Sequence, residues 1–251
     1  MEVHHHPDLQ HKKKNFKEYF LEFIMIFLAV TLGFFAESYR EHIVNKKHEK
    51  QYANSFYEDL QDDRKNLPTL VNSIQTQQIQ PAKSLPVLFS KTSISGQADS
   101  IYFYLRKVIR QQGIMALITD RTYEQIKNSG EMRLITNKQL ADSVVDYYKD
   151  IVFIDYLQQT LLAYKAKLLD NLPLILRSGD YALAIDSLDN VIIPPTHVYL
   201  LNTDSLVINR IVIEINDIGV LSDTIKRMIE ELLSKNIEIK KMLENNYKVA
   251  K

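Results

Sequence analysis

Few residues in this sequence have the types and spacing that metal or cofactor chemistry requires. Four histidines, His4, His5, His6 and His11, lie near the N-terminus, and imidazole is a common metal ligand. A polar tail over residues 1–14 lacks the surrounding residues that orient ligating rings, so a solvated tail is the competing interpretation. The sequence has no cysteine, which excludes disulfides, thiolate metal sites and cysteine nucleophiles. We therefore expect no bound metal and no cofactor.

Catalytic motifs are also missing from the sequence: it has no G-x-S-x-G, glycine-rich phosphate loop or H-E-x-x-H. His197 is the only histidine after residue 48, and it follows Pro194-Pro195, which favours a surface loop. Charges are dense between residues 120 and 133, where helix caps and surface ion pairs explain them. These charged residues are Asp120, Arg121, Glu124, Glu131 and Arg133. We expect that the protein is not an enzyme.

Four tyrosines on one expected long helix are candidates for contacts with a protein partner. They are Tyr147, Tyr148, Tyr156 and Tyr164. Tyrosine is common in cores and at interfaces, because its ring is apolar and its hydroxyl is polar. We predict that the exposed members of this group contact a partner.

The apolar run Phe20–Ala36 determines how the rest of the chain is organised. At about 1.5 Å per residue it reaches about 25 Å, close to the roughly 30 Å of a bilayer core. A buried core helix, a cleaved signal peptide and an interfacial amphipathic helix are the alternatives. The run lacks both a polar face and a convincing cleavage site, so we predict a transmembrane helix over residues 15–36.

Residues inside and beside this run predict how the anchor sits in the bilayer. Glu22 lies near the N-terminal edge, where it can snorkel to the interface. Ala29 and Gly33 have the small-x-x-x-small spacing that lets two helices pack closely, as in a homodimer. Basic flanks favour the cytoplasm, and the two flanks tie in number: Lys12, Lys13, Lys14 and Lys17 precede the run, and Arg40, Lys46, Lys47 and Lys50 follow it. The N-terminal group lies closer to the membrane. We predict a single-pass protein of the inner membrane with a cytoplasmic N-terminus and a periplasmic C-terminal domain.

The overall composition favours a helical protein that does not bind nucleic acid. The 251 residues include 31 basic and 31 acidic side chains, for a net charge of +0. Nucleic-acid binders rely on excess positive charge at phosphates, so we expect no such partner. Only 6 glycines and 7 prolines occur, which favours long helices over loop-rich or all-β structure.

The helical pattern continues from the anchor without Gly or Pro until Pro68. We therefore predict a helical stalk over residues 37–66, whose mixed charges form a solvated face, and a bundle domain over residues 67–251. Pro81 and Pro86 punctuate the next helical segment, and a short helix at residues 101–111 is expected to end at Gly113.

Two long apolar stripes predict the core of the bundle. Residues 137–171 and 204–247 each carry apolar side chains at alternating spacings of three and four, which is typical of amphipathic helices. Leu206–Ile215 is β-branched and could be a strand, but it lacks alternation, so we predict helix. Residues 216–219 are expected to kink or break the last helix. Two facing stripes indicate an antiparallel pair of helices, which the stalk and residues 68–93 are expected to complete. The predicted fold is therefore all-α, an antiparallel helical bundle.

Local signals predict the shorter elements. Thr122-x-x-Gln125 and Thr136-x-x-Gln139 have the capping-box pattern that begins a helix, and Gly130 is expected to end the first of these helices. A further short helix is predicted at Tyr181–Leu188, followed by an extended segment through Pro195.

Two stretches resemble an uncharacterised family of membrane proteins from Bacteroidetes. The first comprises Met1–His6, the aromatic-rich run Phe16–Phe35 and the Gly-Phe-x-Ala-Glu exit Gly33–Glu37. The second is Thr122-Tyr-Glu-Gln-Ile-Lys-Asn-Ser-Gly130, with Leu134-Ile135 and Tyr147-Tyr148 downstream. The resemblance implies a single-pass envelope protein with native histidines, and it implies no activity.

Two functions from different classes fit these observations. In the first, the protein is a membrane-anchored envelope protein whose helical domain is an interaction or scaffolding module. Its partners would be the lipid bilayer and either a second copy of itself or another envelope protein. In the second, the helical domain is a sensor or an unrecognised enzyme with a ligand pocket in the bundle. A pocket with convergent polar groups would favour the second function.

Overall fold

The structure is a computed structural model that describes residues 15–91, 93–110 and 118–247. The predicted all-α fold is confirmed, since these residues form helices and no strand beyond two isolated bridges. The candidate metal ligands His4, His5, His6 and His11 lie outside the described residues, as do the predicted tail over residues 1–14 and the predicted helix stop at Gly113.

The chain divides into two compact units, Met1–Glu49 and Lys50–Lys251, and the boundary falls inside helix α1, Phe16–Ile74. In the first unit, α1 carries the predicted anchor. Among the described residues, this is the one helix long and apolar enough to span a membrane, with a hydropathy of 2.1 over its most apolar 18-residue window. None of that window is buried.

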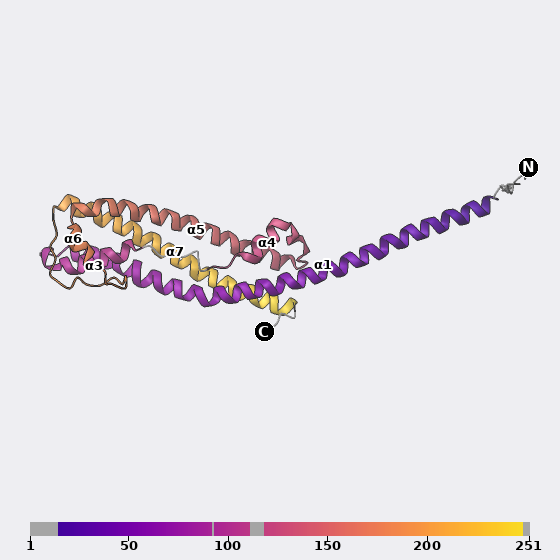
Figure 1. Ribbon diagram of the computed structural model, residues 1–251, viewed down its shortest axis with the longest axis horizontal. Coiled ribbons are helices and arrows are strands. Elements are labelled where there is room, and N and C mark those ends of the chain that lie inside the picture. The colour runs from indigo at the N-terminus through magenta and orange to yellow at the C-terminus, as the bar shows by residue number, and fades with distance from the viewer. Residues whose placement is uncertain (1–14, 92, 111–117, 248–251) are drawn as a thin grey trace, which may run out of the picture. The chain divides into compact units, whose positions relative to one another are not determined.

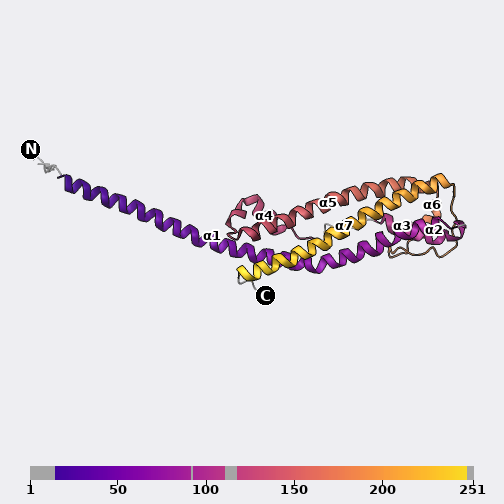
Figure 2. The ribbon, with the colours of Figure 1, turned by 180° about the vertical axis from the view of Figure 1, so that it is seen from behind.

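Three long helices form the second unit: α1 from Lys50 onward, α5 (Lys138–Asn171) and α7 (Ser205–Asn246). Helices α5 and α7 run antiparallel, and the last part of α1 lies along both of them (Figures 1 and 2). The antiparallel bundle predicted from the two apolar stripes is therefore correct. Leu206–Ile215 belongs to α7, so helix and not strand is confirmed for this segment.

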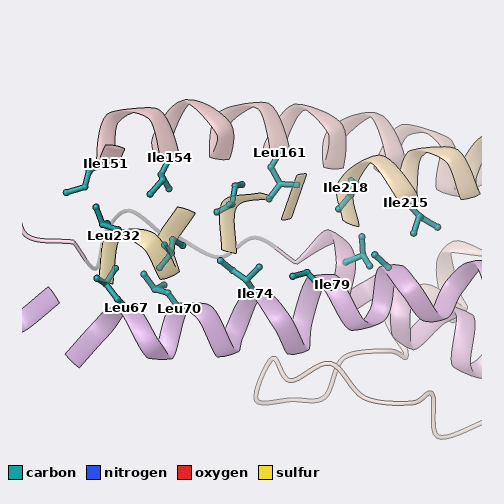
Figure 3. Packing of buried hydrophobic residues seen from close by; sticks show 14 of the residues in the cluster. Leu67, Leu70, Ile74, Ile79, Ile151, Ile154, Leu161, Ile215, Ile218 and Leu232 are labelled. Carbon is teal, nitrogen blue, oxygen red and sulfur yellow. The ribbon is translucent and has the colours of Figure 1, made fainter. Parts of the chain in front are cut away.

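The core lies where the three apolar faces meet. Figure 3 shows Leu67, Leu70 and Ile74 of α1 pointing toward the side chains of α5 and α7. Ile154 and Leu161 come from α5, and Ile215, Ile218 and Leu232 come from α7; all are buried. Burying such a side chain stabilises the fold by roughly 1.5–3 kcal/mol.

The predicted end of the stalk helix near Asn66 is wrong, whereas the predicted packing of the stalk into the bundle is correct from Lys50 onward. The compact unit begins at Lys50, and Phe56 and Leu60 of the predicted stalk are buried in its core. Helix α1 continues through Pro68 to Ile74. A proline inside a helix costs roughly 3 kcal/mol, and burial of Leu67, Leu70 and Ile74 on the same face offsets this cost.

A short π-helix, η1 (Gln75–Ile79), connects α1 to α2 (Gln80–Phe89). Pro81 has no N–H to donate to the preceding turn, which explains why the regular α-helical pattern is interrupted immediately before it. Within η1, Gln78 is buried and its Oε1 accepts a hydrogen bond from Ser222 Oγ of α7 at 2.9 Å. Two polar side chains thus fix the register between η1 and α7.

Helix α7 is continuous, so the last helix is not broken at residues 216–219. Gly219 allows α7 and α2 to pack closely, because a Cβ added there would lie 3.0 Å from Ala82 Cβ of α2. The glycine is therefore explained by the close approach of two helices.

Shorter helices complete the unit, and several of their predicted ends need correction. They are η2 (Ser95–Gln97), α3 (Ala98–Ile109), α4 (Arg121–Ser129), η4 (Glu131–Leu134), η5 (Leu172–Leu174) and α6 (Ser178–Ala182). The predicted helix Tyr181–Leu188 is instead the five-residue α6 followed by turns. Gly130 ends α4 with a φ of 71°, as predicted.

Capping differs from the predicted pattern at two helices. Asn137, and not Thr136, caps α5: its Oδ1 accepts a hydrogen bond from Leu140 N at 3.0 Å. Asp120, and not Thr122, occupies the N-cap position of α4, where it makes no side-chain hydrogen bond. The group that caps α4 comes from a different helix.

Candidate functional site

Two buried carboxylates on α1 form the centre of the most connected polar cluster. Asp59 and Asp63 are one helical turn apart, so their side chains lie on one face of α1, and neither is exposed to solvent. Buried carboxylates are rare unless hydrogen bonds or opposite charges compensate them. Both side chains are satisfied by groups from other elements.

Asp59 caps helix α4 from outside. Its Oδ2 accepts a hydrogen bond from Thr122 N at 3.0 Å, and its Oδ1 lies 2.7 Å from Arg121 Nη2. The first N–H groups of a helix lack partners within the helix, and its N-terminus carries partial positive charge. A carboxylate here satisfies one of these donors and interacts favourably with the helix dipole. This is why α4 needs no cap from Thr122.

Asp63 joins the segment before α4 to helix α5. It accepts hydrogen bonds from Thr119 N and from the Tyr147 hydroxyl, each at 2.7 Å. Burial raises the pKa of Asp63 above its usual value, and the hydrogen bonds from Tyr147 and Thr119 partly oppose this rise. The nearby charge of Asp59 also favours the protonated form.

Two tyrosines of α5 complete the cluster. The Tyr148 hydroxyl donates to Thr119 O at 3.1 Å, and the Tyr148 ring stacks on Tyr123 of α4 with centroids 4.1 Å apart. Burial is the main cause that raises the pKa of both Tyr147 and Tyr148, so both phenols stay protonated and act as donors. We call Asp59, Asp63, Arg121, Tyr147 and Tyr148 the aspartate cluster.

The aspartate cluster is arranged to hold elements together. It links α1, the start of α4 and α5 through buried, charge-assisted hydrogen bonds, which are stronger than neutral ones. Both carboxylates are already engaged, and in the part of the chain that the structure describes no three His, Cys, Asp or Glu side chains are grouped to hold a metal. Within the cluster, Asp63 is the carboxylate whose pKa burial raises.

Tyr147 and Tyr148 are buried, so the predicted partner contact by exposed tyrosines applies to Tyr156 and Tyr164. Tyr156 and Tyr164 are exposed on the outer face of α5. Phe153, which the sequence analysis did not single out, stacks on Tyr156 with ring centroids 6.2 Å apart. With Val152, these residues form an exposed surface that we call the α5 aromatic face: Val152, Phe153, Tyr156 and Tyr164.

The remaining predicted residues occupy separate places. Ala29 and Gly33 are exposed on α1, and a Cβ added at Gly33 meets no atom within 4 Å. His197 is exposed, and its Nδ1 lies 3.2 Å from Asp99 Oδ2. Neither site belongs to the aspartate cluster.

Of the charged group between residues 120 and 133, Glu124 forms a surface ion pair, as expected. Lys127 pairs with Glu124 at 3.0 Å, and Glu131 accepts a hydrogen bond from the Tyr52 hydroxyl. Arg121 differs, because it belongs to the aspartate cluster. Its partner Asp59 lies far away in the sequence, where a local pattern does not reveal it.

The sequence did contain a signal for the missed aspartates. The apolar stripe Phe56, Leu60, Leu67, Leu70 and Ile74 keeps the three-and-four spacing of a buried helix face if residue 63 is included. Asp63 therefore occupies a core position, and Asp59 lies one turn before it. An acid at a core position is informative, because it requires a buried partner.

Replacing Asp59 by alanine is expected to reduce the free energy of unfolding by about 2 kcal/mol, because the buried Thr122 N–H loses its acceptor. Asp62→Ala is the matched control: Asp62 is exposed and pairs with Lys65 at 2.9 Å, so its loss should cost at most about 0.5 kcal/mol. Denaturant unfolding followed by circular dichroism measures both. Equal effects of the two substitutions would contradict a capping role.

The raised pKa of Asp63 predicts a pH dependence of stability. The pKa of Asp63 in the folded state lies above the unfolded value near 3.8. Its contribution to the free energy of unfolding is therefore largest below that pH. Its contribution is lost as pH rises through the folded-state pKa. Asp63→Asn keeps the shape and stays neutral, so the melting temperature of the wild type minus that of the variant should fall as pH rises. Thermal unfolding measured from below pH 3.8 to above the folded-state pKa tests the direction of this change. A difference in melting temperature that is constant or rises with pH would show that burial does not dominate the pKa shift of Asp63.

Comparison with known proteins found no matching family model, no matching curated protein and no matching solved structure. The function therefore has to be argued from the geometry.

Proposed function

We propose that the protein is a membrane-anchored envelope protein whose helical domain is an interaction or scaffolding module. The α5 aromatic face is the observation that carries this proposal. Exposed aromatic side chains that cluster on a rigid element are typical of protein interfaces, where a few aromatic residues provide most of the binding energy. The partner is a second copy of the chain or another envelope protein.

The construction of α5 supports this role. Tyr147 and Tyr148 anchor one side of the helix in the aspartate cluster, while Ile154 and Leu161 pack into the core. The opposite face, with Val152, Phe153 and Tyr156, is thus presented on a rigid support. Rigid aromatic side chains lose little conformational entropy on binding, which favours affinity.

Membrane attachment through residues 20–36 is the second part of the proposal. The supporting observation is the apolar, unburied segment of α1. We place it in the inner membrane with the N-terminus in the cytoplasm and residues 37–251 in the periplasm, because four lysines precede the segment. The resemblance of the N-terminal residues and of Thr122–Gly130 to the Bacteroidetes membrane family is consistent with this placement.

A ligand-binding sensor domain is the alternative function, and one specific observation favours it. A hollow with arginine side chains lies beside α3, as described below. We propose no enzymatic activity and no nucleic-acid partner, for the reasons of sequence and charge given above.

Substitutions on the α5 aromatic face test the interaction proposal. Tyr156→Ala is expected to weaken recovery of a crosslinked partner from native membranes about tenfold, as loss of a central interface aromatic does. Val152→Ser and Val220→Ser form a matched pair, because both valines are 69% exposed on long helices and only Val152 lies on this face. Val152→Ser should reduce recovery and Val220→Ser should not. Unchanged recovery in Tyr156→Ala, with helicity preserved, would refute the proposed surface.

Cysteine labelling tests the proposed topology. The native chain has no cysteine, so single substitutions at Gln10 and Ser95 give unambiguous signals. A membrane-impermeant maleimide applied to cells with a permeabilised outer membrane should label Ser95→Cys and leave Gln10→Cys unlabelled. The reverse pattern would mean that the domain faces the cytoplasm, and labelling of both would argue against a membrane-spanning anchor.

A further inference from the structure

A hollow of about 240 Å³ lies between the end of α3 and the turns after α6. Three apolar side chains, Ile109, Ile185 and Val191, line part of it. The polar lining comes from Arg106, Arg110, Tyr181 and Asp189. The hollow lies apart from both the aspartate cluster and the α5 aromatic face.

Arg106 is held in place without being neutralised. Its guanidinium carbon lies 4.2 Å from the centroid of the Tyr181 ring, a cation–π contact that restricts the side chain. Within the described residues, the Arg106 side chain makes no hydrogen bond and no ion pair, so its N–H donors remain available. A partly buried guanidinium that is fixed in position and keeps its donors is suited to a planar anionic group.

Tyr181 contributes its ring to the hollow, whereas its hydroxyl is buried away from the open space. The hydroxyl oxygen has almost no exposed surface and no hydrogen-bond partner in the described part of the chain. Arg106, which lies over the Tyr181 ring, thus supplies the donors that a ligand in the hollow can reach.

Arg110 differs from Arg106, because the protein itself neutralises it. Its Nη1 donates to Asp189 O at 2.7 Å, and its Nη2 lies 3.5 Å from Asp189 Oδ2. Asp189 adopts a φ of 63°, which is uncommon for a residue other than glycine, in a turn stabilised by hydrogen bonds to Asp186. The Arg110–Asp189 pair thus fixes one wall of the hollow, and Arg106 supplies its net positive charge.

We propose that this hollow binds a small organic monocarboxylate. Arg106 pairs with the carboxylate, and Ile109, Ile185 and Val191 cover its apolar body. A volume of about 240 Å³ lies near the lower end of the range for ligand pockets, which suits a small ligand. One net positive charge matches one carboxylate, and an inorganic anion would leave the apolar walls without a contact. This ligand site goes beyond the interaction function proposed above.

Equilibrium dialysis of radiolabelled benzoate against the full-length protein in lipid nanodiscs tests the proposal. Benzoate should bind saturably, and Arg106→Gln should weaken binding about tenfold or more, since a charge-assisted pair is lost. Tyr181→Leu keeps an apolar side chain at the hollow and removes the ring that holds Arg106, so it should weaken binding about threefold. Circular dichroism checks that each variant is folded, and Tyr181→Leu remains informative if Arg106→Gln does not fold.

Lys107→Gln is the matched control. It makes the same change in net charge on the next residue of α3, where Lys107 lies over the Phe103 ring and not in the hollow. Its affinity for benzoate should equal that of the wild type. Benzyl alcohol and inorganic phosphate should compete poorly, because the first lacks the charge and the second lacks the apolar body.

Several outcomes would overturn the proposal: no saturable binding of benzoate, equal binding by Arg106→Gln, or competition by benzyl alcohol as strong as that by unlabelled benzoate. Strong competition by phosphate would exclude an organic carboxylate as the preferred ligand. The interaction proposal is tested separately, because Tyr156→Ala changes the α5 aromatic face and leaves every side chain of the hollow in place.

Discussion

The need to compensate two buried carboxylates constrains the part of the bundle where α1, α4 and α5 meet. Asp59 and Asp63 have no access to solvent, and a buried ion without partners would destabilise the fold by several kcal/mol. Their partners are the N–H groups of Thr119 and Thr122, the Arg121 guanidinium and the Tyr147 hydroxyl. These partners come from two separate segments of the chain. The carboxylates can be buried only if α4 and α5 are both in position.

The hydrophobic core and the aspartate cluster stabilise the bundle in different ways. The apolar faces of α1, α5 and α7 supply most of the driving force, which depends on area and has no direction. Hydrogen bonds to a buried carboxylate are directional, so the cluster selects one position of α4 among those that would bury similar area. The Gln78–Ser222 hydrogen bond has the same effect between η1 and α7. Hydrophobic packing thus favours a helical bundle, and a few buried polar contacts specify how its helices are positioned.

The same helices present two surfaces with different chemistry. The α5 aromatic face is exposed and largely apolar, whereas the hollow beside α3 combines the Arg106 guanidinium with apolar walls. Exposed aromatic surfaces suit another protein, and hollows that combine a charge with apolar walls suit a small molecule. Ligand binding and partner binding therefore do not compete for the same residues.

The amino-acid sequence by itself determined the all-α class, the apolar segment of α1, and the long helices α5 and α7, because these features depend on local composition and on helical periodicity. It also predicted the ends of α5 and α7 closely, and Gly130 after α4. Only the tertiary structure decided that Asp59 and Asp63 are buried, that Tyr147 is internal while Tyr156 is exposed, and that Arg106 and Tyr181 meet at one hollow. A side chain's surroundings depend on segments far away in the sequence. The packing of those segments fixes which helix face meets the core, and periodicity alone leaves that choice open at polar and amphipathic positions.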